Sequence, residues 1–145
     1  MREVAFDLEA DNLLHGVSKC HIICTHNDEE ARQYTDISEG LAYLNSFDVI
    51  VGHNIGGYDL PAVFKLYGWR PDSRWVDTHI LSRLTEPDRP EGHSIEAWAK
   101  YFGTEKEGKD IEDWSTLTKL MIDRCKSDAR ICWLLWKKKK EEMGL

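Results

Sequence analysis

The sequence predicts an α/β domain in which one mixed sheet carries helices packed against it. The first third of the chain reads as an antiparallel meander of short strands, and the rest alternates helical and extended segments, an order typical of that class. A length of 145 residues is the usual size of one domain, and neither an internal repeat nor a linker divides the sequence. We therefore expect residues 1–145 to form a single domain.

The expected strands are apolar runs bounded by turn residues. Residues 4–9 form the first, and residues 19–25 carry two Ile between two Cys. Residues 30–34 are expected to return antiparallel, which completes the meander. Residues 47–51 are apolar and β-branched, so we expect a buried parallel strand there, with a short edge strand at residues 75–76.

The expected helices carry apolar residues at helical spacing between capping residues. Ser38 is expected to cap the first helix, Gly68 to end the second, and Ser94 to cap the fourth. The fifth helix is the longest, and its apolar residues point towards the core. The helices are expected to begin near residue 38 and then to cover residues 60–67, 77–84, 94–102 and 116 to about 140, with loops at residues 86–92 and 104–109.

The composition favours a folded protein of a reducing compartment. A hydrophobic fraction of 41% with six Trp is typical of a globule and not of a disordered chain. No apolar run reaches membrane-spanning length and no signal-peptide pattern opens the sequence, so we expect a cytoplasmic protein without a membrane partner. The four Cys are not spaced as a zinc framework, and we expect free thiols.

The net charge of −7 runs against nucleic-acid binding, because proteins that hold nucleic acid through counterion release are usually basic. The objection weakens if several acids form a metal site, since two bound divalent cations supply four positive charges. Basic residues gather near the end of the chain, where a solvated helix end is the simplest interpretation. Charge alone therefore does not decide the class of partner.

Asp7 and Glu9 end the first expected strand with one residue between them. Because successive side chains of a strand point to opposite faces, the two carboxylates lie on one face about 7 Å apart. A hard divalent cation such as Mg²⁺ or Mn²⁺ would offset their repulsion, whereas hydrated carboxylates at a strand end would need no ligand. Two further acids favour the cation. Asp59 follows a glycine-rich turn, and Asp128 lies between apolar positions of the last helix, where an unpaired charge is costly.

On these residues the sequence resembles the DEDD superfamily of 3′→5′ exonucleases, whose members have a ribonuclease H-like fold. The family's first motif, Asp-x-Glu at the end of an apolar strand, stands at residues 6–9 (FDLE). The second, Asn-x-x-x-Phe/Tyr-Asp, stands at residues 54–59 (NIGGYD), and the third ends in Asp128. The resemblance extends to the proofreading domain of phage replicative family A DNA polymerases, through residues 77–78 (DT), 81–84 (LSRL), 95–98 (IEAW) and 113–114 (DW).

The resemblance implies a two-metal site. Asp7, Glu9, Asp59 and Asp128 would be the catalytic residues and would hold two Mg²⁺ or Mn²⁺ ions, with Asp7 bridging both. Glu9 and Asp128 would hold the ion that carries the attacking water, in the usual two-metal arrangement for phosphate chemistry. The implied activity is hydrolysis of DNA 3′ ends, preferably single-stranded, with release of nucleoside 5′-monophosphates. The implied setting is the cytosol of a phage host or bacterium, beside a separate DNA polymerase.

The resemblance also implies substrate contacts around the first two motifs. They would come from main-chain and side-chain groups at Leu8, Ala10 and Leu13, with the Leu13 side chain wedged against the terminal base. Asn54 and Tyr58 would line the second motif. Each of these residues also has an ordinary structural interpretation, such as a core position for Leu13.

The third motif departs from the family pattern. Active members carry Tyr four residues before the last Asp, or His five before it, to orient or deprotonate the water, and here these positions are Arg124 and Asp123. Arg stays protonated and cannot act as a base. Arg124 is open to two interpretations: an i,i+4 ion pair with Asp128 that competes with metal, or a substrate contact that holds the scissile phosphate. His93 is the remaining candidate for the base.

Two other functions stay open beside the exodeoxyribonuclease. A catalytically weakened nucleic-acid-binding or replisome-associated module is favoured by Arg124. A 3′→5′ exoribonuclease is the third, because nothing in the sequence recognisably reads the 2′-hydroxyl of RNA.

Overall fold

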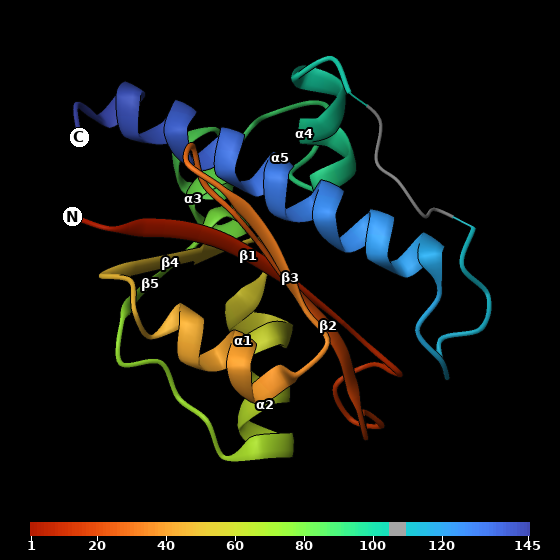
Figure 1. Cartoon of the computed structure of the whole chain (residues 1–145). Helices are drawn as coiled ribbons and strands as arrows, with labels where there is room; N and C mark the ends of the chain where they lie inside the picture. Colours follow the sequence, from red (N-terminus) through yellow and green to blue (C-terminus); the bar gives the residue numbers. More distant parts are fainter. Residues whose placement is uncertain (105–109) are drawn as a thin grey trace.

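The computed structural model of the chain describes residues 1–104 and 110–145. Its centre is a five-stranded sheet of order β3-β2-β1-β4-β5, with β1 in the middle (Figure 1). β1 pairs antiparallel with β2 and parallel with β4, β2 pairs antiparallel with β3, and β4 pairs parallel with β5. The strands are β1 (Glu3–Ala10), β2 (Cys20–His26), β3 (Ala31–Tyr34), β4 (Val49–Gly52) and β5 (Arg74–Asp77). The predicted α/β class, an antiparallel meander extended by parallel strands, is confirmed.

Helices cover both faces of this sheet. In Figure 1, α5 crosses one face, and α1 and α2 lie on the other. The helices are α1 (Ile37–Leu44), α2 (Leu60–Tyr67), α3 (Thr78–Thr85), α4 (Ile95–Tyr101) and α5 (Lys119–Met143), and a short π-helix, η1 (Ile55–Asp59), leads into α2. α5 is 25 residues long and packs on β1, β2 and β4. It therefore covers the centre of the sheet.

β1 is covered on both faces, and its alternating side chains enter two different cores. The even-numbered residues of β1 pack with α1 and α2 in one core. Ala5 belongs to the opposite core, together with Trp98 of α4 and Leu135 of α5. Asp7 and Glu9 follow Ala5 at every second position, so their side chains project towards α5.

Most predicted boundaries are confirmed to within a few residues, but two helix starts are wrong. Asp36, not Ser38, caps α1. Its backbone is extended, and its carboxylate accepts a hydrogen bond from the backbone amide of Glu39 at 3.3 Å. The Ser38 hydroxyl donates to the same carboxylate at 2.7 Å. α5 begins at Lys119 and not at residue 116, because the hydroxyl of Thr118 accepts the hydrogen bond that caps it.

The remaining expectations about the fold have mixed outcomes. Gly68 ends α2 with a φ of 66°, and Ser94 caps α4 by accepting from an amide at 3.1 Å, as predicted. The four Cys are free and buried. Residues 105–109 of the predicted second loop lie outside the described residues. None of the helices in the described part of the chain is both long enough and apolar enough to span a membrane.

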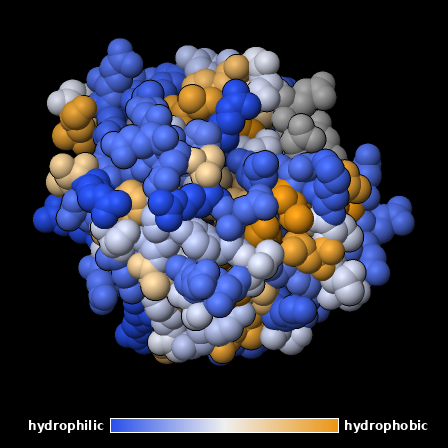
Figure 2. Space-filling view, in the orientation of Figure 1, coloured by the Kyte–Doolittle hydropathy of each residue, from blue (hydrophilic) through white to orange (hydrophobic). Residues whose placement is uncertain are grey.

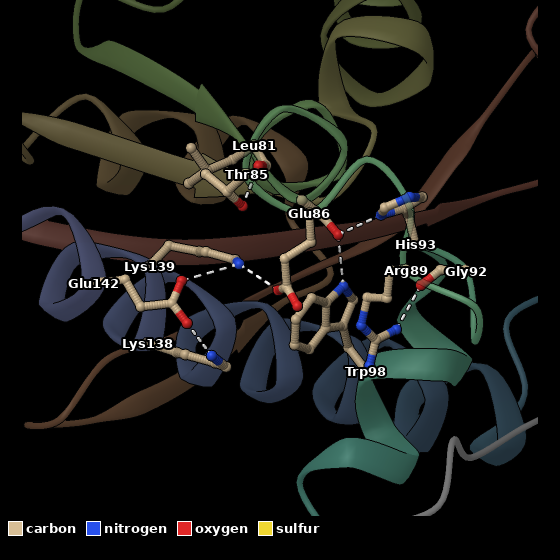
Figure 3. Close-up of polar contacts among 11 residues, drawn as sticks. Leu81, Thr85, Glu86, Arg89, Gly92, His93, Trp98, Lys138, Lys139 and Glu142 are labelled. Carbon is tan, nitrogen blue, oxygen red and sulfur yellow. Dashed lines mark hydrogen bonds and ion pairs between the residues drawn. The ribbon is translucent and has the colours of Figure 1, made fainter.

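A buried lysine ties the C-terminal half of α5 to the loop after α3 (Figure 3). Lys139 is 0% exposed, and its ammonium donates to Glu86 at 2.6 Å and to Glu142 at 3.1 Å, 5.2 Å from the centre of the Trp98 ring. Trp98 in turn donates to the hydroxyl of Ser82 in α3 at 2.9 Å. Glu142 lies in α5 itself, whereas Glu86 follows α3 and Trp98 lies in α4, so the buried ammonium and the Trp98–Ser82 hydrogen bond connect α3, α4 and α5.

Candidate active site

A pocket of about 590 Å³ opens where the end of β1 meets η1 and α5. All four acids singled out in the sequence line it: Asp7 and Glu9 from β1, Asp59 from the end of η1, and Asp128 from α5. Segments more than a hundred residues apart in the chain thus bring their carboxylates together. Hydrophilic side chains cover most of the face of the molecule in Figure 2, and apolar ones form small groups on it.

Three of the four acids are close enough to share one cation. Asp7, Glu9 and Asp128 each offer one carboxylate oxygen, and these oxygens lie within 4.8 Å of one another. Asp59 lines the same pocket and is only 4% exposed. An all-oxygen set of this kind suits a hard divalent cation such as Mg²⁺, Mn²⁺ or Ca²⁺.

The electrostatics of the site also fit a cation. Burial raises the pKa of the Asp7 carboxyl well above its usual range, and the charges of Glu9 and Asp128 raise it further. Burial, followed by the charge of Glu9, likewise raises the pKa of Asp59. The Oδ2 atoms of Asp7 and Asp59 are both buried, and neither has a hydrogen-bond partner among the described residues. A buried carboxylate oxygen without a donor is costly, and a bound cation would remove that cost.

Asp77 positions the turn that carries Asp59. One oxygen of its carboxylate accepts from the backbone amide of Asn54 at 2.8 Å, and the other accepts from the amide of Gly56 at 3.0 Å. The same side chain caps α3 by accepting from the amide of His79 at 3.0 Å. A single carboxylate therefore joins the end of β5 to the turn after β4. In the sequence Asp77 stands out only as part of a motif, and its spacing does not predict this contact.

Two glycines make the tight turn possible. A Cβ atom on Gly52 would lie 2.1 Å from the Ile55 side chain, and one on Gly57 would lie 2.6 Å from Oδ1 of Asn54. Asn54 itself has a φ of 59°, in the left-handed region that Asn tolerates better than most residues. The spacing of the second motif is thus a requirement of backbone geometry, and it brings Asp59 to the pocket.

The residues expected to contact substrate all line the pocket: Leu8, Ala10, Leu13, Asn54, Tyr58 and Arg124. Leu13 is 68% exposed, which excludes its interpretation as an ordinary core leucine. The Tyr58 hydroxyl donates to the backbone carbonyl of Asn12, and burial raises the pKa of Tyr58 to about 12, so its ring is held in place as a neutral phenol. These positions form a wall with an apolar side chain at its rim.

Arg124 reaches further into the site than the sequence indicated. Its Nε lies 3.2 Å from Oε1 of Glu9 and 3.9 Å from Oδ2 of Asp128, so the predicted i,i+4 contact exists but the shorter one is to β1. The guanidinium carbon lies 5.2 Å from the centre of the Trp114 ring, and the backbone carbonyl of Trp114 is bonded to the ring of His21 at 2.7 Å. Trp114 and Glu9 thus hold the guanidinium between them.

The histidines near the site have different roles from those expected. His93 does not lie where a general base would have to be. Its ring is hydrogen-bonded to the hydroxyl of Ser82 at 2.7 Å, and it is not among the residues that line the pocket. His53 lines the pocket but is bonded to Thr78 at 2.9 Å and to the carbonyl of His93 at 2.7 Å.

His79 was missed by the sequence analysis and lines the pocket, with its ring 5.2 Å from that of His53. A signal for it existed, because His79 lies two residues after the end of β5, which runs parallel to β4, the strand that precedes Asn54. Residues at the carboxyl ends of neighbouring parallel strands lie at the same edge of the sheet. Trp114 also lines the pocket and was not among the predicted site residues.

Comparisons with known proteins identify the fold. No protein-family model and no curated protein matches the chain. Among solved structures, Brucella melitensis NrnC matches with a TM-score of 0.76 at 19% identity, over 99% of this chain and 76% of that one. Escherichia coli RNase D, described as an exoribonuclease involved in structured RNA processing, matches with a TM-score of 0.75 at 18% identity, over 99% and 40%. Exonuclease X in complex with 5′ overhanging duplex DNA matches with a TM-score of 0.68 at 16% identity, over 99% and 93%.

These similarities confirm the ribonuclease H-like fold predicted from the motifs. NrnC has also been solved with bound Mg²⁺ and bound to pGG. The class that the fold and the pocket define is therefore an α/β domain of ribonuclease H-like fold with an acidic cluster that could hold a metal ion. Its neighbours include proteins described with RNA and with DNA, so the fold leaves the nucleic acid undecided.

Proposed function

We propose that the chain is a metal-dependent 3′→5′ exonuclease, with residues 1–145 acting as one catalytic domain. The observation that carries the proposal is the convergence of four carboxylates from β1, η1 and α5 in one pocket. The proposed reaction is hydrolysis of the terminal phosphodiester of a single-stranded DNA 3′ end, with release of a nucleoside 5′-monophosphate. The pocket volume is in the range that takes a small ligand, which supports recognition of a strand end.

Asp7, Glu9, Asp59 and Asp128 would hold the divalent cations, Mg²⁺ or Mn²⁺. Bound there, the cations would lower the pKa of a water molecule and stabilise the leaving oxygen. Asp77 positions Asp59 through the backbone of the turn, and this contact does not depend on metal.

The pocket wall suggests how a strand end is oriented. Leu13, exposed at the rim, offers an apolar surface for the terminal base. Asn54 and Tyr58 line the pocket from the turn. The Tyr58 hydroxyl donates a hydrogen bond to the backbone carbonyl of Asn12, which keeps the ring against that wall. Arg124 is the cation nearest the acids, and its planar fork matches two phosphate oxygens.

A ribonuclease is the second candidate, and the observation that favours it is the set of solved structures that share this fold. RNase D is an exoribonuclease, and NrnC has been solved bound to pGG. The TM-scores to RNase D (0.75), to NrnC with pGG (0.72) and to Exonuclease X with DNA (0.68) are close to one another, so RNA must be tested beside DNA.

A weakened binding module is the third candidate, and Arg124 favours it because it engages two of the acids. The loss of a general base lowers rates by about 10²- to 10⁴-fold, whereas a metal-bound water is already activated. We therefore propose a slow enzyme in preference to an inactive one. The resemblance to phage proofreading domains further supports, as a proposal, a separate DNA polymerase as partner in a phage-host or bacterial cytosol.

The test is a time course on 5′-labelled single-stranded DNA and RNA of one sequence, with Mg²⁺, with Mn²⁺ and with chelator. We expect metal-dependent shortening one nucleotide at a time, faster on DNA. Asp7→Asn should abolish it, and Asp88→Asn, an exposed acid outside the pocket, should not. Faster shortening of RNA would select the ribonuclease. Metal-dependent binding without shortening would select the binding module, and cleavage that survives Asp7→Asn would exclude the proposed site.

A further inference from the structure

A second cavity, of about 690 Å³, lies between α5 and the strands β2 and β3, and we call it the α5–β3 groove. Lys126, Ser127 and Arg130 line it from the helix, and His26 and Gln33 line it from the strands. Among the described residues it shares no lining residue with the acidic pocket. The proposed catalysis therefore leaves the α5–β3 groove without a role.

The groove is basic, although the whole chain carries a net charge of −7. Lys126 and Arg130 are exposed, and among the described residues no carboxylate lies within ion-pair distance of either. The acid that lines the groove, Asp123, is paired with Lys119 at 2.9 Å, so its charge is compensated. Arg32 also borders the groove, but its guanidinium is already paired with a carboxylate at 3.0 Å. Two cations of the groove are thus available to an anion.

Polar side chains of the strands face the same space. Cys24 of β2 packs against α5, Gln33 pairs with Cys24 across β2 and β3, and His26 follows Cys24 at the second position, so all three lie on the helix side of the sheet. Burial, and then the charge of Arg130, lower the pKa of His26, so its ring is neutral at neutral pH and close to the guanidinium. The groove therefore combines positive charge with neutral hydrogen-bonding groups.

A solvated helix surface does not account for this arrangement. Lys126 and Arg130 are four residues apart on one face of α5, where two like charges repel each other. A bound anion would relieve that repulsion. The hydroxyl of Ser127 and the side-chain amide of Gln33 add hydrogen-bond donors. Charge together with neutral donors is the combination that proteins use to hold the phosphates of a nucleic acid.

The groove and the acidic pocket flank the same stretch of α5. Arg124 and Asp128 line the pocket, and Lys126 and Arg130, each two residues further along, line the groove. At 3.6 residues per turn, a step of two residues leads about 160° round the helix. A helix with its side chains is about 10–12 Å across, whereas the phosphates of one strand follow each other every 3.4 Å or so along a duplex. A dinucleotide is therefore too short to occupy both cavities, and a strand of several nucleotides is long enough.

We propose that the α5–β3 groove binds the phosphates upstream of a 3′ end that lies in the acidic pocket, so that the chain acts on strands in preference to dinucleotides. Lys126 and Arg130 pair with phosphate oxygens, and Ser127 and Gln33 donate hydrogen bonds to them. Contacts of this kind hold a strand in register without reading its bases. The inference rests on the proposed function for the position of the 3′ end. DNA and RNA share the phosphodiester chemistry that the groove recognises.

Fluorescence anisotropy with a labelled twelve-nucleotide oligothymidylate tests the binding, in Mn²⁺ and in the Asp7→Asn background so that the strand stays intact. Adding Lys126→Gln and Arg130→Gln together should weaken binding at least about tenfold. The slope of log affinity against log salt should become shallower by about 1.4, since each phosphate contact on a single strand contributes about 0.7. The same titration with oligouridylate shows whether DNA or RNA is held more tightly.

The matched control is the pair Arg83→Gln and Lys100→Gln. Arg83 of α3 and Lys100 of α4 are exposed and line neither cavity, so their loss changes the net charge equally and should leave binding and its salt dependence unaltered. An equal loss in the control pair would reduce the effect to net charge and overturn the groove.

Kinetics on two substrate lengths provide the second readout. With Lys126→Gln and Arg130→Gln, KM for the twelve-nucleotide strand should rise about tenfold, while its kcat and the cleavage of a thymidine dinucleotide stay as in wild type. A KM that rises equally for the dinucleotide, or does not rise for the longer strand, would overturn the inference. The charge-retaining pair Lys126→Arg and Arg130→Lys should keep wild-type KM, which separates loss of charge from loss of structure.

Failure of the groove is distinguishable from failure of the exonuclease. Cleavage by wild type together with unchanged strand binding in the glutamine pair would remove the groove and leave the proposed function. Groove-dependent binding without cleavage by wild type would remove the proposed function and leave the α5–β3 groove as a nucleic-acid-binding surface.

Discussion

The two halves of α5 hold buried charge in opposite ways. Near its C-terminal end, Lys139 is fully buried but meets two carboxylates from Glu86 and Glu142, so its charge is compensated. Near its N-terminal end, Asp128 joins an acidic cluster in which Arg124 supplies the one positive charge that the ion pairs of the described residues show. The difference teaches that buried charge fastens the fold where it is paired and prepares a ligand site where it is left in excess.

Asp7→Asn, which removes one of the acids in excess, is expected to have the largest effect. Removing this carboxylate should lower metal-dependent cleavage at least about 10³-fold, equivalent to about 4 kcal/mol of transition-state stabilisation. The same change should raise the free energy of unfolding in chelator by about 1 kcal/mol, because a neutral amide relieves repulsion from Glu9 and Asp128. Cleavage assays and urea unfolding measure the two effects, and a destabilised Asp7→Asn protein in chelator would contradict the excess-charge account.

Lys139→Ala tests the C-terminal part of α5, where the buried charge of the lysine is compensated. Loss of a buried stem and of its ion pairs should lower the free energy of unfolding by about 2–4 kcal/mol. Lys139→Met, which keeps the volume, should cost less, since Glu86 and Glu142 keep access to water. Mn²⁺ affinity should be unchanged in both. Urea unfolding measures these effects, with Lys126→Ala, at an exposed lysine of the same helix, as the control. An unaltered unfolding curve for Lys139→Ala would refute the stabilising role of Lys139.

The pH dependence of stability should show the excess charge directly. Asp7 and Asp59 have folded-state pKa values raised above their unfolded ones, so the folded protein holds more protons. Their contribution to stability is complete at low pH and is lost as pH rises through the folded-state pKa values, by up to about 1.4 kcal/mol per pH unit for each group. In Mn²⁺ the loss should shrink, because a bound cation favours the deprotonated form. Urea unfolding across the acidic to neutral range, with chelator and with Mn²⁺, compares the two, and parallel curves would speak against a cation at these acids.

Arg124→Tyr offers the smallest and sharpest change. It removes the positive charge of Arg124 and restores the side chain found at this position in active members of the resembled family. We expect the rate of cleavage to rise about tenfold, at the low end of what general-base assistance contributes. Single-turnover kinetics at saturating Mn²⁺ would measure it. An unchanged rate would show that the absence of a Tyr at position 124 does not limit the reaction.

The sequence predicted well what depends on local pattern. The order of strands and helices, the alternation that sends Asp7 and Glu9 towards one face, and the caps at Gly68 and Ser94 all follow from neighbouring residues. The gathering of Asp59 and Asp128 with them could be anticipated only through the family resemblance, because no periodicity links residues so far apart.

Contacts between distant segments were beyond sequence reasoning. The short contact from Arg124 to Glu9 spans 115 positions, so the visible i,i+4 partner Asp128 was the only one that spacing could suggest. The role of Asp77 in holding the turn before Asp59 depends on the adjacency of β4 and β5. His93 was misplaced for the same reason, since its bond to Ser82 is fixed by the packing of the loop against α3.

The position of β1 in the sheet also governs how the site would come apart. β1 pairs with β4 along residues 3–5 and with β2 along residues 5–10, and its backbone amides near Ala5, where both partners meet it, are therefore among the last to be exposed when parts of the molecule open transiently. In a hydrogen-exchange experiment the amides near Ala5, two residues before Asp7, should exchange only on the timescale of global unfolding, far more slowly than those of the edge strand β3. A mutation that weakens the protein without unfolding it would then reduce the number of working molecules and leave the activity of each one unchanged.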